Sequence, residues 1–405
     1  MTLSNVANQL TGSKIRFHRL LVVIKQTAFE EYSQLKLRGQ APKALRWKRL
    51  ESRYNAHKRC VNDLLGLLRE HKIEFSCVNR VELDRQHLSD VDLVVAVGGD
   101  GTVLSTAHFL DHGTIPLLGI NSDPISRKDL SVENLKKKTD ERRSHGALCM
   151  CTARSMYTEV PKVLHGESKL SVRTRVKCVV KSTFSETRIV PVLNDILITN
   201  PCPAAVSRFR MGWLQPDHHH DQNDNNSSKN GLRSFFEPLV NAQSSEQHNG
   251  EYLSNLRSQI PSSNVYGTVT RFSGIPYDVV NSINVWSSGL WVPTATGSSA
   301  AIHSAGAPII SDHSSPDLQY LIREHMTDVA SMHNLDKGML SNGEQLHIRW
   351  NSQKGKIFVD GSHLNHNLEL GDEILINNTA PTLSLFMTND EDDEEEKNSS
   401  ANVES

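Results

Sequence analysis

One stretch of the chain, Val91–Asp123, constrains the fold more than any other because it reads as a complete βαβ unit. Its first part, Val91–Val97, is an almost continuous apolar run, which is typical of a parallel strand covered on both faces. Apolar residues recur with helical spacing from Thr102, and a second apolar run, Ile115–Ile120, follows a glycine. The sequence Gly-Gly-Asp-Gly-Thr at Gly98–Thr102 is therefore predicted to join the carboxyl end of a strand to the amino end of a helix.

Open α/β sheets bind their ligands at this kind of turn. Its glycines let a backbone approach a ligand closely, and the free N–H groups of a helix start favour an anion. Asp100 lies in the middle of the turn, where its carboxylate would repel a bare phosphate unless a divalent cation or a hydroxyl group lies between them. The alternative is a tight turn in which Asp100 only caps the helix. Neither of the two common phosphate-binding fingerprints, GxGxxG and GxxxxGK[ST], occurs here.

The Gly-Gly-Asp-Gly-Thr turn after a hydrophobic strand resembles the signature of the NAD kinases and of the wider diacylglycerol kinase-like superfamily. Further segments resemble successive motifs of NAD kinases and occur in the family's order. Their amino-acid sequences are most similar to those of the plant-type NADH kinase branch. These segments are LNDILITNPCPAAVSRF at 193–209, SSGLWVPTATGSSAAIHSAG at 287–306, DLQYLIRE at 317–324 and IFVDG at 357–361. The resemblance covers roughly residues 18–212 and 283–388.

The resemblance implies ATP-dependent phosphorylation of the adenosine-ribose 2′-hydroxyl of NADH, and also of NAD⁺, with Mg²⁺. Asp100 is then the residue that orients and deprotonates the hydroxyl, and phosphoryl transfer needs such a base and little other covalent help from the protein. The ATP phosphates are expected at Gly98, Gly99, Gly101 and Thr102. The dinucleotide is expected at Asp100, Gly101, Asn194, Asp195, Ser288, Ser299, Ala300, Ala301 and Ser304. No direct protein ligand for a metal is predicted.

The chain departs from the family pattern at three places. Ser288 stands where most members have an acid, Ala301 replaces a tyrosine, and Trp286 replaces a residue that is often basic. The missing acid at position 288 suggests a preference for NADH, because a site without a nearby carboxylate attracts the positively charged oxidised nicotinamide less.

Two other functions stay open. A lipid or sphingoid kinase of the same superfamily would share the glycine turn, but Asn194-Asp195 and the Ser299–Ser304 loop argue against it. A catalytically silent nucleotide-binding protein is the second alternative, and the retained Asp100 argues against that.

The chain has 405 residues, of which 37% are hydrophobic and 22% charged, as in a water-soluble protein with about two domains. No apolar run is long enough to cross a membrane, and no secretory signal or peroxisomal terminus is present. Six scattered cysteines favour reduced thiols and a cytoplasmic location, with a weak transit peptide as the alternative. The small net charge of −2 gives no support for nucleic acid as a partner. The resemblance implies a homodimer or a larger homo-oligomer.

Segment by segment, the sequence predicts a Rossmann-like α/β domain at 18–155 and an all-β sandwich at 165–388. The alternation of apolar and charged residues from Lys169 to Val180 predicts one half-exposed strand, and Leu383–Phe386 is placed in the same all-β series. In the family, by contrast, the last segment returns to the first domain. A flexible amino terminus at 1–17, a low-complexity insert at 214–282 and an acidic disordered tail at 389–405 complete the expected organisation.

Overall fold

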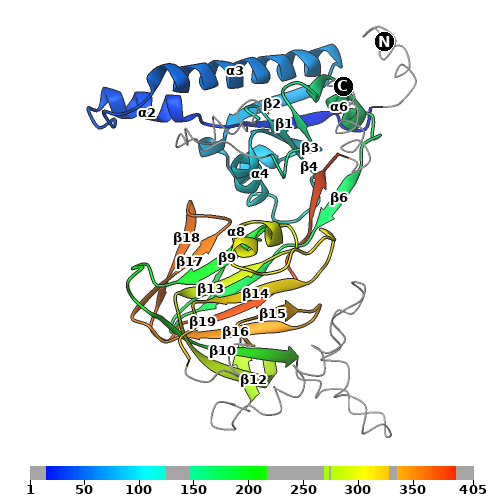
Figure 1. The fold of residues 1–405 in the computed structure, drawn as a ribbon. Coiled ribbons are helices and arrows are strands. Elements are labelled where there is room, and N and C mark those ends of the chain that lie inside the picture. Colours follow the sequence, from blue (N-terminus) through cyan, green and yellow to red (C-terminus); the bar gives the residue numbers. More distant parts are fainter. Residues whose placement is uncertain (1–14, 125–145, 217–268, 273–274, 328–334, 389–405) are drawn as a thin grey trace, which may run out of the picture. The chain divides into compact units, whose positions relative to one another are not determined.

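The computed structural model describes residues 15–124, 146–216, 269–272, 275–327 and 335–388. It divides the chain into two compact units, shown in Figure 1: unit 1 comprises residues 1–173 and 381–405, and unit 2 comprises residues 174–380. The acidic tail, most of the amino terminus and residues 217–268 of the expected insert lie outside the described residues. Among the residues that are described, no helix combines the length and the apolar character needed to cross a membrane.

Unit 1 contains a seven-stranded sheet with the order β2-β1-β3-β4-β20-β6, and β5 also pairs with β4. Strands β2, β1, β3 and β4 are parallel. All six residues of β3 and all five of β4 are buried, as expected of strands covered on both faces. The strands are β1 Arg19–Ile24, β2 Glu74–Asn79, β3 Leu93–Gly98, β4 Leu117–Asn121, β5 Cys151–Thr152, β6 Leu170–Arg173 and β20 Leu383–Phe386.

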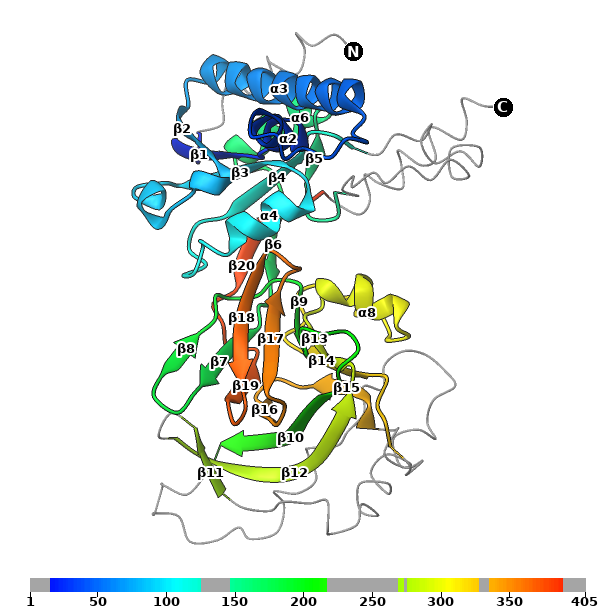
Figure 2. The same ribbon diagram turned by 90° about the vertical axis from the view of Figure 1, so that its left-hand side faces the viewer.

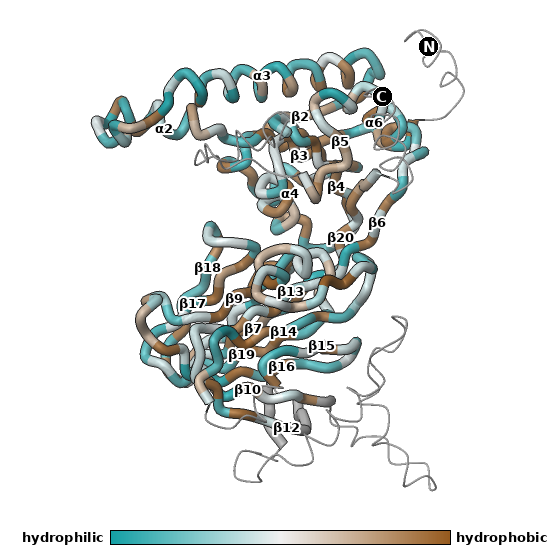
Figure 3. The backbone as a smooth tube through the Cα atoms, in the orientation of Figure 1, coloured by the Kyte–Doolittle hydropathy of each residue, from teal (hydrophilic) through white to brown (hydrophobic). Residues whose placement is uncertain are grey.

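Helices lie on both faces of this sheet. The long helix α3 (Trp47–Glu70) and α6 (Met156–Leu164) share one core cluster with side chains of β1, β3 and β4, whereas α4 (Asp100–Ala107) contacts β3 and β4 from the other face. Helix α2 (Ala28–Leu37) has no buried residue and packs beside α3. Figure 3 shows hydrophilic colouring along α3 and hydrophobic colouring in β3 and β4. The predicted Rossmann-like arrangement is confirmed.

Strand β20 corrects the sequence-based placement of Leu383–Phe386. It pairs in parallel with β4 at Leu385 and antiparallel with β6, so it belongs to the sheet of unit 1 and not to the β domain. Phe17, expected in a flexible terminus, is only 6% exposed and packs edge-on against Phe386.

Unit 2 is a sandwich of two sheets with the orders β11-β12-β10-β16-β19-β7-β8 and β15-β14-β13-β9-β17-β18. Side chains from both sheets form one hydrophobic core, as the predicted sandwich requires. Figure 2 shows these strands from the side. In the first sheet the strands are β7 Lys177–Lys181, β8 Glu186–Arg188, β10 Ser207–Pro216, β11 Val269–Phe272, β12 Ile275–Ser287, β16 Gln345–Trp350 and β19 Glu373–Asn377. In the second they are β9 Asp195–Thr199, β13 Gly289–Pro293, β14 Leu318–Arg323, β15 Lys337–Leu340, β17 Lys354–Val359 and β18 Leu364–Glu369.

The alternating stretch Lys169–Val180 is not one strand. It forms β6 in unit 1 and β7 in unit 2, with the boundary between the units after Arg173. The alternation is also inverted in the first half, since Val172 is 47% exposed while Arg173 is 4% and Arg175 0% exposed. The prediction of one half-exposed strand was wrong because period two shows which residues share a face but not which face is buried.

Both ends of the expected insert are strand. Strand β10 continues through Leu214, which is buried, to Pro216, and β12 begins at Ile275. The two strands pair antiparallel from Ser207 with Ser287 to Pro216 with Tyr277. In sequence, residues 217–268 therefore lie between the two strands of a long β-hairpin.

Candidate functional site

The glycine turn of unit 1 is built on a contact that only glycine permits. Strand β3 ends at Gly98, and a Cβ atom there would lie 2.2 Å from Oγ1 of Thr102 and 3.0 Å from Cβ of Lys25. Gly99 follows in an extended conformation as the N-cap of α4. Thr102 is 3% exposed and packs inward on Gly98, so its side chain holds the turn together.

Asp100 does not cap the helix. Gly99 is the N-cap residue of α4, and Asp100 is the first residue of the helix. Instead, Oδ2 accepts a hydrogen bond of 3.0 Å from the backbone N–H of Gly146, and Oδ1 accepts one of 2.8 Å from the backbone N–H of Leu148. These contacts fix the orientation of a half-buried carboxylate.

Gly101 differs from Gly98 in what it does for the fold. It is exposed, and a Cβ atom at this position would have no protein atom within 4 Å. The packing of unit 1 therefore does not require glycine here. A close approach of another molecule to the first turn of α4 does explain a missing side chain.

A polar cluster lies at the same edge of the sheet, and sequence reasoning missed it. His57 of α3 is 2% exposed, and its Nδ1 lies 2.8 Å from Oγ of Ser122, the residue after β4. Burial, and then the charge of Lys25, lowers the pKa of His57 to about 4, so the imidazole is neutral at pH 7. Arg53 of α3 lies 3.8 Å from the carboxylate of Asp123.

A signal for this cluster was present in the sequence. The apolar stripe of α3 runs through Tyr54, Val61, Leu64 and Leu68, and His57 occupies the stripe position between the first two. A titratable residue on the buried face of a helix requires a polar partner, which here is Ser122.

The predicted pair Asn194-Asp195 lies at the start of β9 in unit 2. Asp360, which follows β17, is 6% exposed, and its carboxylate accepts hydrogen bonds from the backbone N–H groups of Leu193 (3.1 Å), Asn194 (2.6 Å) and Asp195 (3.1 Å). Burial, and then the charge of Asp360, raises the pKa of Asp195 to about 6. Asp360 thus holds the backbone of the pair while its charge acts on the Asp195 side chain.

The loop after β13 packs directly on this pair. Thr294 donates from Oγ1 to the carbonyl of Leu193 at 2.5 Å and from its backbone N–H to the carbonyl of Asn194 at 2.9 Å. A Cβ atom on Gly297 would lie 2.2 Å from the Asn194 carbonyl oxygen, so only glycine allows this approach. The residues that follow, predicted to contact the dinucleotide, are exposed: Ser299, Ala300, Ala301 and Ser304.

Ser288 lies elsewhere in unit 2. It precedes β13, whose other end, Pro293, pairs with Asp195. Five residues of strand separate Ser288 from Pro293, a distance of about 17 Å. The structure therefore brings Asn194 and Asp195 together with the loop after Thr294, but not with Ser288.

The neighbourhood of Ser288 also changes the charge argument. Its Oγ donates a hydrogen bond to the carboxylate of Glu324. Loss of the acid at position 288 therefore does not leave this place without a carboxylate, and the charge argument at position 288 loses its support, while the preference for NADH stays a prediction. A cavity of about 240 Å³ is lined by Arg208, Trp286 and His325 among others, and it includes neither Asn194 nor Asp195.

A dedicated metal site is not formed by the parts of the chain that the structure describes. Within them no group of three or more His, Cys, Asp or Glu side chains could hold a metal ion. The donor set therefore does not fit Mg²⁺ bound by protein alone.

Comparisons with known proteins agree with this geometry. The family model of the ATP-NAD kinase N-terminal domain matches residues 6–123. A probable NADH kinase of Oryza sativa subsp. japonica is 31% identical over 351 residues, which is 87% of each chain. The NADH kinase of Arabidopsis thaliana is 30% identical over 374 residues, 91% of this chain and 96% of that one.

Solved structures show the same fold. The crystal structure of yeast NADH kinase complexed with NADH aligns with a TM-score of 0.53 and 14% identity, over 93% of this chain and 87% of that one. The Rossmann-like unit and the β-sandwich are thus a fold that this chain shares with a solved NADH kinase. The chain belongs to the NAD kinase family, and the plant NADH kinases are among its relatives.

Proposed function

We propose that the protein transfers the γ-phosphoryl group of ATP to the adenosine-ribose 2′-hydroxyl of NADH, giving NADPH and ADP, and that it also accepts NAD⁺. The observation that carries the proposal is the carboxylate of Asp100, oriented by the N–H groups of Gly146 and Leu148 in a glycine turn. Membership of the NAD kinase family and the plant NADH kinase relatives support the choice of substrate.

In unit 1, Asp100 accepts the proton of the attacking hydroxyl. The 2′-oxygen forms a bond to the γ-phosphorus, the bond from that phosphorus to the bridging oxygen of ATP breaks, and ADP leaves with the bonding electrons. Gly101, where a Cβ atom would have no protein atom within 4 Å, leaves room for the phosphates at the turn. Because the described residues form no dedicated metal site, Mg²⁺ would enter bound to the ATP phosphates, and no step is assigned to it.

In unit 2, we assign dinucleotide binding to Asn194, Asp195 and the loop with Ser299, Ala300, Ala301 and Ser304. A carboxylate with a pKa of about 6 is mostly ionised at pH 7 and accepts hydrogen bonds from sugar hydroxyls. Asp360 keeps the pair in place. Ser288 would contact only the far end of an extended ligand.

The test is an assay of purified protein with ATP, Mg²⁺ and either NADH or NAD⁺, compared with the variant Asp100→Asn. We expect turnover to fall by about 10²- to 10⁴-fold, the usual range for a positioned general base. An asparagine would also turn an N–H group towards Gly146 or Leu148, so melting temperatures are measured for both proteins. Near-normal turnover in the variant would exclude the proposed role of Asp100.

The same assay separates the rival functions. A lipid kinase would phosphorylate diacylglycerol or sphingosine and leave both dinucleotides unchanged. A silent binding protein would bind ATP or NADH in calorimetry and release no ADP.

We also propose a reducing compartment such as the cytosol, and a homo-oligomeric state. All six cysteines are described and all are free thiols, which supports the first point. A fluorescent fusion tests the location, and light scattering on the purified protein tests the assembly. A fusion in the secretory pathway or a monomeric mass would contradict the respective proposal.

A further inference from the structure

Lys25 lies beside the glycine turn, at the edge of the sheet where β1 and β3 both end. It follows β1 directly, and its backbone N–H donates to the carbonyl of Val97 at 3.0 Å. Its Cβ atom is only 3.0 Å from the place that a Cβ atom on Gly98 would occupy. The first carbon of the lysine side chain thus lies against the first glycine of the turn.

Lys25 is partly buried among other cations. Burial lowers its pKa, and the charges that act on it are Asp123, which raises the pKa, and Arg80 and Arg53, which lower it. The cluster gathers three cations around one carboxylate: Lys25 directly after β1, Arg53 on α3 and Arg80 on the 3-10 helix Arg80–Glu82. His57 adds no charge at pH 7 because its pKa is about 4.

The other charged groups nearby do not reverse this balance. Glu30 of α2 accepts hydrogen bonds from the backbone and the hydroxyl of Thr27 and lies 3.6 Å from Lys58 of α3, so its charge is matched. Asp100 of α4 accepts hydrogen bonds from the backbone N–H groups of Gly146 and Leu148. Among the described residues whose charges act on Lys25, two are cations and one is a carboxylate, so positive charge predominates beside the turn.

We infer that Lys25, with Arg53 beside it, binds the phosphate groups of ATP at the Gly98–Thr102 turn, an assignment that rests on the proposed function. A polyphosphate supplies the negative charge that the cluster lacks and replaces the water that a half-buried ammonium group has lost. Gly101 opens the approach to the turn, and the backbone N–H groups at the start of α4 add to the attraction. Ser122 and His57 hold α3 against β4, which keeps Arg53 at the turn.

The experiment compares Lys25→Gln and Arg53→Gln with two control variants that also remove one positive charge. The controls are Lys36→Gln on α2 and Arg59→Gln on α3, both at exposed positions. For each protein, ATP binding is measured by calorimetry without dinucleotide, and KM is measured for ATP and for NADH. We expect Lys25→Gln to weaken ATP binding by about 10- to 100-fold, the loss typical of one charged hydrogen bond. The KM for NADH and both control variants should stay within about twofold of the parent.

Arg53→Gln should weaken ATP binding less than Lys25→Gln, because Arg53 also pairs with Asp123. If a glutamine variant fails to fold, Lys25→Arg keeps the charge, and amine labelling of the parent tests the contact directly. ATP should then protect Lys25 from acylation while NADH should not. Unchanged ATP binding in folded Lys25→Gln, or labelling that ATP does not affect, overturns the inference.

The inference and the proposed function can fail separately. If the parent phosphorylates NADH and its ATP affinity does not depend on Lys25, the kinase assignment holds and this one is wrong. If the parent binds ATP through Lys25 but phosphorylates neither dinucleotide, the cluster is confirmed as a phosphate site and the proposed reaction is wrong.

Discussion

The carboxylate of Asp360 accepts a hydrogen bond of 2.6 Å from the backbone N–H of Asn194, across 166 residues of sequence. The same carboxylate accepts from the two neighbouring N–H groups, so one buried side chain fixes the start of β9. Asp360 is therefore a positioning residue. It orients Asn194 and Asp195 and has no assigned contact with a substrate.

We predict that Asp360→Asn lowers the free energy of unfolding by about 1–3 kcal/mol, because one of its acceptor oxygens becomes a donor facing a backbone N–H. It should also raise KM for NADH while leaving KM for ATP unchanged. The control is Asp372→Asn, since Asp372 is also 6% exposed and accepts from the backbone N–H of Glu369. Equal effects of both variants on KM for NADH would show that Asp360 is only structural.

The pH dependence of kcat/KM distinguishes a role of Asp360 in substrate binding from a role in stability alone. Ionised Asp195 accepts hydrogen bonds at both oxygens, whereas protonation removes its charge and turns one oxygen into a donor, and its pKa is about 6. We therefore expect kcat/KM for NADH to fall as the pH drops below about 6. Removing the charge of Asp360 should shift this fall to lower pH, because that charge raises the pKa of Asp195. An acidic limb at the same pH in Asp360→Asn would contradict the assignment.

Gly101→Ala tests whether the turn is shaped for a ligand. No protein atom obstructs a methyl group at Gly101, so the alanine should stabilise α4 by about 0.5–1 kcal/mol. Gly66→Ala in α3 is the matched control, because that glycine is helical and equally unobstructed. We expect both variants to melt slightly higher and only Gly101→Ala to lose activity. Full activity in Gly101→Ala would mean that no substrate approaches the turn there.

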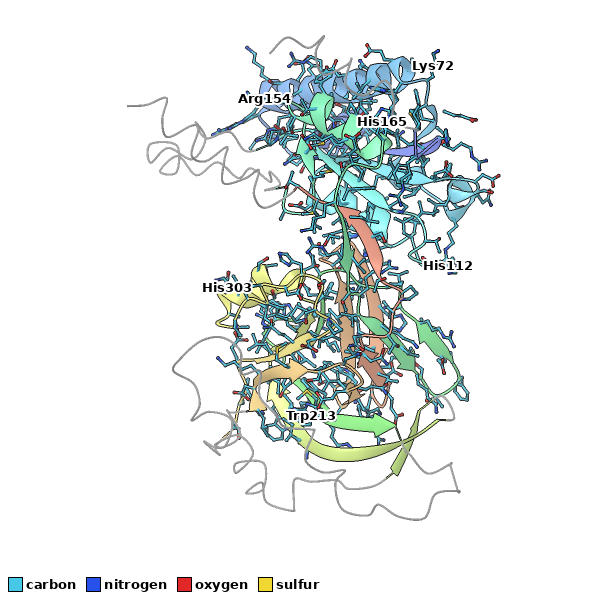
Figure 4. All side chains as sticks on the ribbon, turned by 90° about the vertical axis from the view of Figure 1, so that its right-hand side faces the viewer. Lys72, His112, Arg154, His165, Trp213 and His303 are labelled. Atoms are coloured by element: carbon cyan, nitrogen blue, oxygen red, sulfur yellow. The ribbon has the colours of Figure 1, made fainter. Side chains whose placement is uncertain are left out.

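The stability of unit 1 should depend on pH through His57. Its pKa falls from 6.5 to about 4 on folding, so the unfolded chain binds the proton more tightly. Stability is therefore full above pH 6.5 and is lost as the pH falls towards 4, by about 3 kcal/mol in total. His57→Gln should remove most of that loss in denaturant unfolding followed at several pH values. His112→Gln, at the exposed histidine labelled in Figure 4, should leave it unchanged.

Ser288→Asp should leave the preference between NADH and NAD⁺ nearly unchanged. Glu324 already places a carboxylate on Ser288, so the variant adds a second negative charge where one exists. Position 288 also lies about 17 Å along the strand from the partner of Asp195. We expect the ratio of the two kcat/KM values to change by less than about threefold. A tenfold gain for NAD⁺ would restore the view that position 288 decides the preference.

The sequence predicted well what depends on short-range order. The unit from β3 to β4 has a strand buried on both faces, a glycine turn and a short helix, and each leaves a periodic or compositional mark within a few residues. The stripe of α3 was equally legible, apart from the meaning of His57. In these places local pattern and final structure coincide because packing follows periodicity.

Long-range contacts left no such mark. Asp360 accepts a hydrogen bond from Asn194, and Asp100 accepts one from Gly146. Each pair is far apart in the chain, and no rule of sequence spacing predicts it. The burial of Arg173 and Arg175 contradicts the usual exposure of arginine, so the first half of the alternating stretch was assigned to the wrong face. Lys25 was missed because a single lysine after a strand has no significance until the turn beside it is known.

The position of β20 in the sheet of unit 1 affects how the protein can fold during its synthesis on the ribosome. Unit 2 is one continuous segment, residues 174–380, and can fold as soon as that segment has emerged. Unit 1 cannot, because β20 lies between β4 and β6 in its sheet and is synthesised only after the whole of unit 2. Throughout the synthesis of unit 2, the nascent chain therefore contains β4 but not β20, which pairs with it. A premature stop at residue 380 would retain every residue of the glycine turn but remove β20, an inner strand of the sheet.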